Sequence, residues 1–223
     1  EKDLGSLGDI TTDNLFDGNR RVRGRIVTRD VGVLAGLEEI LYFLKDGSKD
    51  FRPRVAGDFE ILTRFKDGDN LQEGDVIMEI EAGVKDLLAV ERVLLNFLSR
   101  MSGVATFSSS VVELVADYDV LITSTRKTLW GWLDKKAVTV GGGGTHRLNL
   151  ADAIMIKDNH LALLGDFNDI FDKLASADTD AIELPIFRAS RSPRIRPRDI
   201  EAREPASFAA LLTTPLRSFS EIA

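Results

Sequence analysis

Three short clusters of cationic residues lie between Ser124 and His160, and each follows a short apolar run. They are Thr125-Arg126-Lys127-Thr128, then Gly141-Gly142-Gly143-Gly144-Thr145-His146-Arg147, then Ile156-Lys157-Asp158-Asn159-His160. Guanidinium groups bind carboxylates and phosphates through paired hydrogen bonds, and lysine adds a compact positive charge. We therefore expect a site for a small phosphate or carboxylate compound.

The charge of this segment is opposite to that of the whole chain. The 223 residues carry a net charge of −7. Between Ser124 and His160, six lysines and arginines face three aspartates, which leaves +3. A local positive patch on an acidic protein favours the focusing of a small anion. It argues against nucleic acid or an anionic membrane as a partner.

Several other classes of site are excluded by what the sequence lacks. The chain contains no cysteine, so neither a disulfide framework nor a thiolate site is expected. The two histidines, His146 and His160, lack the spacing of zinc ligands, and no Gly-x-Ser-x-Gly elbow of a serine hydrolase occurs. No apolar run is long enough for a transmembrane helix, and no signal peptide is visible. A soluble cytoplasmic protein is the expectation.

The positioning elements fall into two predicted domains. In residues 1–116, alternating apolar residues predict strands at 22–29, 59–65 and 76–80, and a helix at 31–45. A helical period then runs from residue 85 to about 116. We expect a small α/β sandwich with a connecting helix. Glu91 and Arg92 interrupt the apolar face of that helix, so they form either a structural ion pair or a place where Arg92 is held at an interface or pocket.

Residues 117–223 form the second predicted domain. Strands are expected at 120–124, 153–156 and 181–184, with helices at 133–138 and 166–175 between them. This rhythm predicts parallel β/α units, in which ligands bind at the carboxyl ends of strands. Arg126, Lys127 and Lys157 would then share one rim.

Two features of this domain are ambiguous or atypical. The glycines from Gly141 to Gly144 form either a flexible turn or, with His146 and Arg147 attached, a loop whose N–H groups cradle phosphate. From about residue 185 the chain holds five of its six prolines, seven arginines and no lysine or glycine. An irregular stretch at 188–203 and a short amphipathic helix at 205–212 are expected there.

Taken together, the motifs resemble those of the quinolinate phosphoribosyltransferase family. The resemblance rests on the three clusters above and on three earlier segments: Gly8-Asp9-Ile10-Thr11-Thr12, Glu91 to Leu98, and Ser102-Gly103-Val104-Ala105-Thr106. It implies an N-terminal α/β sandwich followed by an incomplete parallel α/β barrel. It also implies a homodimer or higher homo-oligomer in which the neighbouring sandwich completes each site.

The resemblance implies a reaction as well. Quinolinate and phosphoribosyl pyrophosphate would give nicotinate mononucleotide, pyrophosphate and carbon dioxide, with Mg²⁺ as cofactor. This is a step of de novo NAD biosynthesis. The implied substrate-binding residues are Arg92, Thr125, Arg126, Lys127, His146, Arg147 and Lys157, and the implied catalytic residues are Lys127, Lys157 and Glu183.

The chain also departs from the family pattern. A full eight-stranded barrel needs about 250 residues, and the acidic and glycine-rich segments of the later family strands have no counterpart apart from Glu183. We therefore expect a shortened or altered barrel that binds quinolinate weakly and turns over poorly. The alternatives are a non-catalytic anion-binding homologue and a paralogue linked to molybdenum transport.

Overall fold

The computed structural model describes residues 4–45, 58–152, 154–165, 167–176 and 186–188. They divide into two compact units, with the boundary between Thr145 and His146. The first unit contains the segment after residue 116 up to Thr145, because its helix packs on the long helix that comes before it. The predicted domain boundary after residue 116 stays a prediction.

The first unit is built around a small antiparallel sheet. Its strands are β1 (Arg21–Val27), β5 (Val76–Gly83) and β3 (Glu60–Leu62), in the order β1-β5-β3. Arg21 lies opposite Gly83, and Leu62 lies opposite Glu79. A second pair joins β2 (Gly32–Val33) to β4 (Asn70–Leu71). The strands predicted at 22–29, 59–65 and 76–80 are thus confirmed with shorter or shifted ends.

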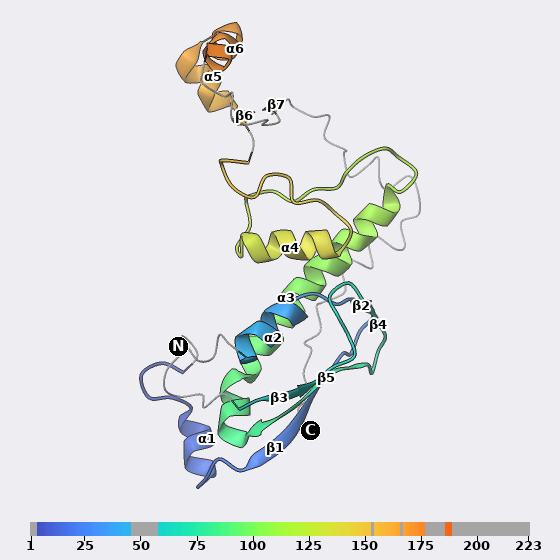
Figure 1. Ribbon diagram of the computed structural model, residues 1–223, viewed down its shortest axis with the longest axis vertical. Coiled ribbons are helices and arrows are strands. Elements are labelled where there is room, and N and C mark those ends of the chain that lie inside the picture. The colour runs from blue at the N-terminus through green and yellow to red at the C-terminus, as the bar shows by residue number, and fades with distance from the viewer. Residues whose placement is uncertain (1–3, 46–57, 153, 166, 177–185, 189–223) are drawn as a thin grey trace. The chain divides into compact units, whose positions relative to one another are not determined.

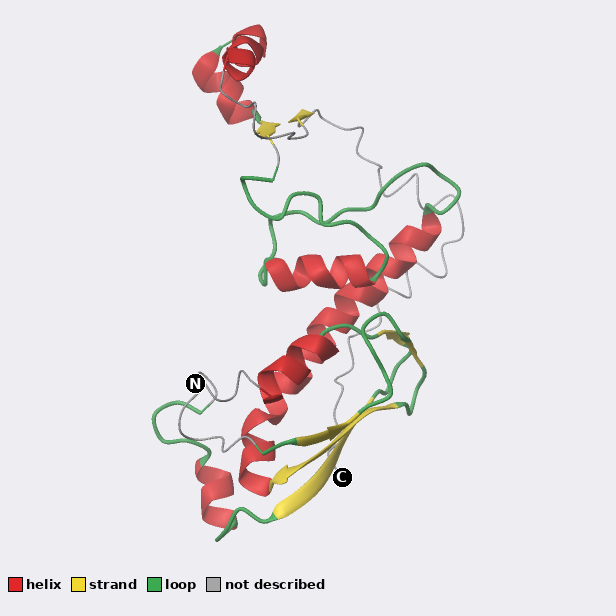
Figure 2. Cartoon of the chain, in the orientation of Figure 1, coloured by secondary structure: helices red, strands yellow, loops and turns green. Residues whose placement is uncertain are grey.

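Three helices accompany these strands (Figures 1 and 2): α1 (Ile10–Leu15), α2 (Leu37–Lys45) and α3 (Val84–Leu114). The Asp9 carboxylate accepts from Thr12 N–H at 3.0 Å and caps α1, which explains the early Gly8–Thr12 motif. The helix predicted from residue 31 begins only at Leu37. Gly36 has a φ of +96°, which a helix cannot continue through.

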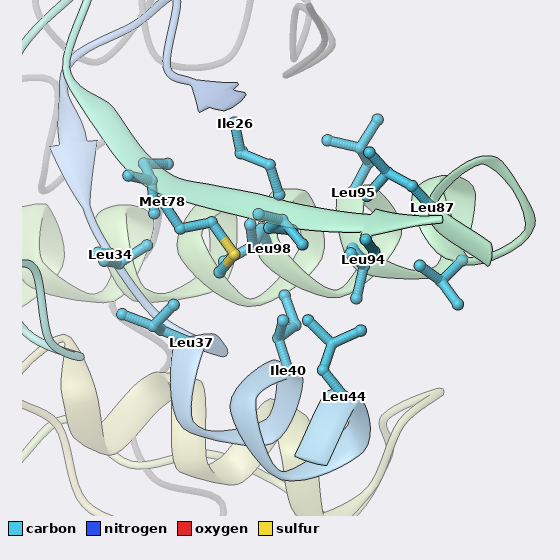
Figure 3. Close-up of a cluster of buried hydrophobic side chains, with 14 of the residues drawn as sticks. Ile26, Leu34, Leu37, Ile40, Leu44, Met78, Leu87, Leu94, Leu95 and Leu98 are labelled. Atoms are coloured by element: carbon cyan, nitrogen blue, oxygen red, sulfur yellow. The ribbon is translucent and has the colours of Figure 1, made fainter. Parts of the chain in front are cut away.

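The core of this unit lies between the sheet, α2 and α3. Figure 3 shows Ile40 and Leu44 of α2 pointing toward Leu94 and Leu98 of α3, with Met78 of β5 beside them. All five side chains are at most 1% exposed. The helical period predicted from residue 85 is confirmed, since its apolar stripe is what this core buries.

A run of small residues on α3 joins the helix to β2. The Ser102 hydroxyl accepts from Ala35 N–H at 3.0 Å and donates to the Ala35 carbonyl at 3.2 Å. Thr106 Oγ1 accepts from Val33 N–H at 2.9 Å. The Ser102–Thr106 motif therefore satisfies the backbone of a short strand.

The last helix of the first unit is α4 (Trp132–Val140), which packs on α3. It confirms the helix predicted at 133–138. The strand predicted at 120–124 is wrong: within it only Thr123 forms a bridge, a parallel one to Gly144. The bridge is nevertheless parallel, as the β/α rhythm requires.

The second unit contains a parallel strand pair and two helices. Strand β6 (Ile154–Ile156) pairs with β7 (Ile186–Arg188), and α5 (Asp158–Leu164) and α6 (Phe167–Ser176) lie between them in sequence. The strand at 153–156 and the helix at 166–175 are confirmed, whereas α5 was not predicted. The strand predicted at 181–184, the irregular stretch from residue 189 and the helix at 205–212 lie outside the described residues. The architecture is the expected N-terminal α/β sandwich followed by an incomplete parallel α/β barrel.

Candidate anion-binding site

The Thr125–Thr128 loop presents two exposed cations. Arg126 and Lys127 are both exposed, and neither forms an ion pair with any described residue. Lys127 N–H donates to Thr125 Oγ1 at 3.0 Å, a local turn in which the threonine hydroxyl supports the backbone. Both charges thus remain available to an anion in solution.

A buried carboxylate at the start of α4 holds the end of this loop. Asp134 is 5% exposed. It accepts from Arg100 Nε at 3.0 Å and Nη2 at 2.8 Å, from Thr128 Oγ1 at 2.5 Å and from Trp130 N–H at 3.3 Å. The paired hydrogen bonds from Arg100 fix the carboxylate plane. Asp134 therefore connects the loop to the rigid helix α3.

The hydrogen bonds between Arg100 and Asp134 stabilise the ionised form of both side chains. The hydrogen bond from Arg100, against the opposing effect of burial, lowers the pKa of Asp134 below its ordinary value, and the Thr128 hydroxyl adds to the lowering. The same hydrogen bond raises the pKa of Arg100. Trp130 covers the pair, with its ring 5.1 Å from that of Phe97 and 6.0 Å from the guanidinium carbon of Arg100. Trp130 thus packs locally against Phe97 and Arg100.

The next residue, Lys135, is 2% exposed and bonds to the residues that follow the Thr123–Gly144 bridge. Its ammonium donates to the Thr145 carbonyl at 2.6 Å and to Ser124 Oγ at 3.4 Å. Ser124 N–H donates to Gly144 O at 3.1 Å alongside. The residues just before the Thr125–Thr128 loop and just before His146 are therefore joined, although the two loops are 20 positions apart in the sequence.

The glycine run between these loops does not form an open phosphate cradle. The N–H groups of Gly141 to Gly144 all donate to backbone carbonyls, namely those of Ala137, Thr139, Val138 and Ile122. A Cβ at Gly141 would lie 2.3 Å from Ala105 O of α3. The phosphate-cradle alternative is thus wrong for these donors, and Gly141 is needed for the close approach of α4 to α3.

In the second unit, His146 has a φ of 50° and is the one described residue other than glycine in the left-handed region. Its Nδ1 accepts from Arg147 N–H at 2.7 Å. Arg147 is 7% exposed. A strained backbone at such a pair is common at binding sites, where neighbouring structure maintains it.

Lys157 directly precedes α5, and its side chain is exposed. Its N–H donates to His160 Nδ1 at 2.9 Å. The Ile156–His160 cluster is therefore the junction of β6 and α5, and His160 serves the turn. This geometry supports the predicted position of Lys157 at the carboxyl end of a strand. Arg126 and Lys127 belong to the first unit, and Arg147 and Lys157 to the second, so their predicted convergence stays a prediction.

Not every cation of the segment contributes to a patch. Lys136 donates to Glu38 Oε2 and Glu39 Oε1, each at 2.6 Å, and lies 3.4 Å from Asp67 Oδ2. Burial lowers its pKa, but these carboxylates more than compensate and raise the value overall. Its charge is thus neutralised, and the available positive charge is smaller than the sequence count of +3 suggests.

Arg92 lies on α3 and is exposed, and it has no ion pair among the described residues. Glu91 is half-buried, also without a described ion pair. The described residues thus offer no ion-pair partner for either side chain, and the structural pair stays one of the two alternatives. The predicted role of Arg92 at an interface stays open, and Glu183 lies outside the described residues.

Sequence reasoning missed three residues that organise this region, namely Arg100, Asp134 and Lys135. Charged side chains on a helix are normally solvent-exposed, and nothing in the sequence marks Asp134 and Lys135 as buried. A weak signal did exist, since Asp134 lies six positions after Thr128 and a carboxylate in the first turn of a helix often bonds to the preceding loop.

Solved structures with the same overall fold define the class of protein. The structure of NadC from Streptococcus pyogenes matches with a TM-score of 0.70 and 34% identity over 84% of this chain and 64% of that one. The nicotinate-nucleotide pyrophosphorylase from Ehrlichia chaffeensis also matches at 0.70 and 34%, over 83% and 65%. Both comparisons indicate a two-part α/β phosphoribosyltransferase architecture.

Sequence comparisons identify the family. The quinolinate phosphoribosyl transferase N-terminal domain matches residues 9–102, and the C-terminal domain matches residues 104–187. A probable carboxylating nicotinate-nucleotide pyrophosphorylase of Methanothermobacter thermautotrophicus is 40% identical over 72% of this chain, and that of Mycobacterium leprae is 39% identical over 79%. The chain belongs to the quinolinate phosphoribosyl transferase family. It spans 56% and 60% of the length of these two relatives.

The described residues contain neither a cluster of metal ligands nor a helix that could span a membrane. No group of three or more histidine, cysteine or acidic side chains in them is arranged to hold a metal ion. None of the helices in the described part of the chain has the length and apolar character needed to cross a membrane.

Proposed function

We propose that this chain acts in the transfer of a phosphoribosyl group from phosphoribosyl pyrophosphate to quinolinate, with loss of carbon dioxide. The products would be nicotinate mononucleotide, pyrophosphate and carbon dioxide, a step of de novo NAD biosynthesis. Membership of the family and the printed names of its relatives support this assignment. The available cations of the Thr125–Thr128 loop fit the charge of both substrates.

Quinolinate carries two carboxylates on adjacent carbons of a pyridine ring. Arg126 and Arg147 have the planar donor pairs that bind carboxylates through two hydrogen bonds. His146 would add a donor through Nε2–H, because its Nδ1 accepts from Arg147 N–H. Thr125 supplies a hydroxyl at the same loop. Arg92 is exposed on α3, where a neighbouring subunit's site would receive it in a homodimer or higher homo-oligomer. Each group binds and orients the ring.

Lys127 and Lys157 would neutralise phosphate oxygens of the second substrate. The bond between the ribose carbon and pyrophosphate breaks as the pyridine nitrogen attacks, so negative charge grows on the leaving group. The ribose passes through an oxocarbenium-like state, which an acidic side chain such as Glu183 would stabilise. Loss of carbon dioxide then leaves an electron pair on the ring carbon beside the alkylated nitrogen. The positive charge of the ring stabilises this electron pair until the carbon takes up a proton from solvent. No nucleophile from the protein is needed.

Three further assignments rest on the resemblance alone. Mg²⁺ is the proposed cofactor. The described residues offer no cluster of histidine, cysteine or acidic side chains for it. A homo-oligomer is the proposed assembly. The cytoplasm is the proposed location, without nucleic acid or membrane partners.

The observation that carries the proposal is the connection between the two loops. The Lys135 ammonium donates to the Thr145 carbonyl and to Ser124 Oγ, and Ser124 N–H donates to Gly144 O. Within the first unit, the residues that directly precede Thr125 and His146 are therefore joined. Binding of a dicarboxylate by cations from two such segments is the arrangement that we propose.

The purified chain tests the proposal directly. Calorimetric titration with quinolinate and with phosphoribosyl pyrophosphate measures binding, and formation of nicotinate mononucleotide measures turnover. Binding of both compounds with product formation supports the proposal. Binding of quinolinate without phosphoribosyl pyrophosphate and without product supports the non-catalytic alternative. Preference for another pyridine carboxylate would identify the molybdenum-linked paralogue.

A further inference from the structure

We propose that Asp134 is a positioning residue that sets the conformation of the Thr125–Thr128 loop and thereby the quinolinate affinity contributed by Arg126. The inference rests on the proposed function for its ligand. Its structural part concerns the loop alone and is tested independently of any substrate.

The first step is that both ends of the loop are fixed. At its start, Ser124 N–H donates to Gly144 O at 3.1 Å and Ser124 Oγ lies 3.4 Å from the Lys135 ammonium. At its end, Thr128 Oγ1 donates to Asp134 at 2.5 Å and accepts from Gly131 N–H at 2.9 Å. The two cations lie between these fixed ends.

The second step is that Asp134 is itself held from outside the loop. Arg100, which lies on α3, donates two hydrogen bonds to the Asp134 carboxylate. Helix α3 has 31 residues, and its apolar face is buried in the core. Asp134 is 5% exposed, so water does not replace a lost partner easily. The loop is thus tied to the longest described helix of the first unit.

The third step links this support to binding. Arg126 and Lys127 are exposed and have no described ion pair, so their own contacts do not order them. A preorganised loop loses less conformational entropy when a ligand binds, which raises affinity. The Asp134 carboxylate is buried and accepts from Arg100, Thr128 and Trp130. Its influence on quinolinate is therefore expected to pass through the exposed Arg126 and Lys127.

The experiment uses the full chain with Asp134→Asn, which keeps the shape and removes the charge. Thr128→Val is a milder companion that leaves the Arg100–Asp134 pair intact. Hydrogen exchange of residues 125–131 reports loop order without ligand. We expect faster exchange in both variants, and quinolinate binding that is weaker by roughly 10-fold in Asp134→Asn, the size expected for one lost charged hydrogen bond.

Two controls separate positioning from general destabilisation. Ile80→Val lowers stability in the core at strand β5, which pairs with β1 and β3 rather than with the loop. Glu113→Gln removes an exposed carboxylate near the end of α3. Neither should change exchange at 125–131 or quinolinate affinity. A double-mutant cycle with Arg126→Ala provides the readout that a purely structural role would not move. In the Arg126→Ala background, Asp134→Asn should weaken quinolinate binding far less than in the native chain.

Unchanged exchange at 125–131 in a folded Asp134→Asn variant would overturn the inference, as would full additivity in the cycle. If Asp134→Asn does not fold, Thr128→Val gives the same comparison. If the unmodified chain binds no quinolinate, the proposed function fails, and the exchange comparison still decides whether Asp134 orders the loop.

Discussion

Arg21 of the N-terminal sheet and Arg126 of the Thr125–Thr128 loop are both arginines at the surface, yet their surroundings differ completely. Arg21 lies 3.1 Å from Asp58, 2.7 Å from Glu60 and 3.4 Å from Glu81. Arg126 has no carboxylate partner among the described residues. On the sheet, Arg21 and Arg23 pair with carboxylates. In the loop, Arg126 and Lys127 have no described carboxylate partner and remain available to a ligand. An exposed arginine therefore indicates an anion site only where the fold withholds an acidic neighbour.

The largest expected effect comes from removing the loop arginine. Arg126→Ala should lower kcat/KM for quinolinate. The expected loss of transition-state stabilisation is about 3–4 kcal/mol, by analogy with loss of one preorganised donor. Thermal stability should hardly change, because the side chain is exposed. Steady-state kinetics and a melting curve measure both quantities. Arg23→Ala on the sheet is the matched control, and an equal loss of activity in that variant would refute the comparison.

The next largest effect is the dependence of folding stability on pH that comes from the Arg100–Asp134 pair. Unlike the exposed arginines compared above, this pair includes a buried carboxylate. Arg100 holds the pKa of Asp134 below its ordinary value of 3.8. The pair therefore stabilises the fold above that value, and the stabilisation is lost as pH falls through the lowered pKa. At pH 7, Asp134→Asn should lower the free energy of unfolding by about 1–3 kcal/mol.

Urea titrations of both chains from pH 7 to strongly acidic pH measure this dependence. The difference between the native chain and Asp134→Asn should shrink below about pH 4, where the unfolded carboxyl becomes protonated. A constant difference across the whole range would show that the charge of Asp134 contributes nothing.

A smaller effect is expected from giving the loop an acidic neighbour, as the sheet has. Leu129 is 87% exposed and follows Thr128. Leu129→Glu should weaken quinolinate binding by about 1 kcal/mol at low salt, through pairing with the cations and repulsion of the ligand. Leu129→Gln is the uncharged control. The difference between the two variants should fade as salt rises, and its absence at low salt would contradict the role assigned to the loop.

The smallest effect belongs to the sheet. Arg21→Gln removes three ion pairs on an exposed face, where solvent and salt screen them strongly. We expect a melting temperature close to that of the native chain and unchanged quinolinate binding. A loss of binding in this variant would mean that the sheet face, too, contributes to the site.

Much of the fold was predictable, and the reasons are visible in particular residues. The apolar stripe through Leu94 and Leu98 predicted α3, because burial of a helical face depends on spacing alone. The strand predicted at 120–124 was wrong for the opposite reason. Val120 to Ile122 form a short apolar run, but within 120–124 only Thr123 forms a bridge, because pairing depends on a distant segment.

In the site, too, features set by the local sequence were predicted, and features set by distant contacts were not. The exposed cations of the loop were found, since their types and spacing are local properties of the sequence. The burial of Asp134 and Lys135 and the neutralisation of Lys136 were missed, because each depends on tertiary contacts with α3, Thr145 or α2. Family resemblance supplied motifs, and the structure gave the Ser102–Thr106 and Gly141 positions a packing role.

The unbroken course of α3 has a consequence for how sequences of this kind can vary. Arg92 and Arg100 lie on the same helix, about 12 Å apart along its axis. Substitutions between them leave that relation untouched. A single inserted or deleted residue would instead rotate one arginine about 100° around the axis relative to the other. Length, rather than composition, is what this stretch must preserve.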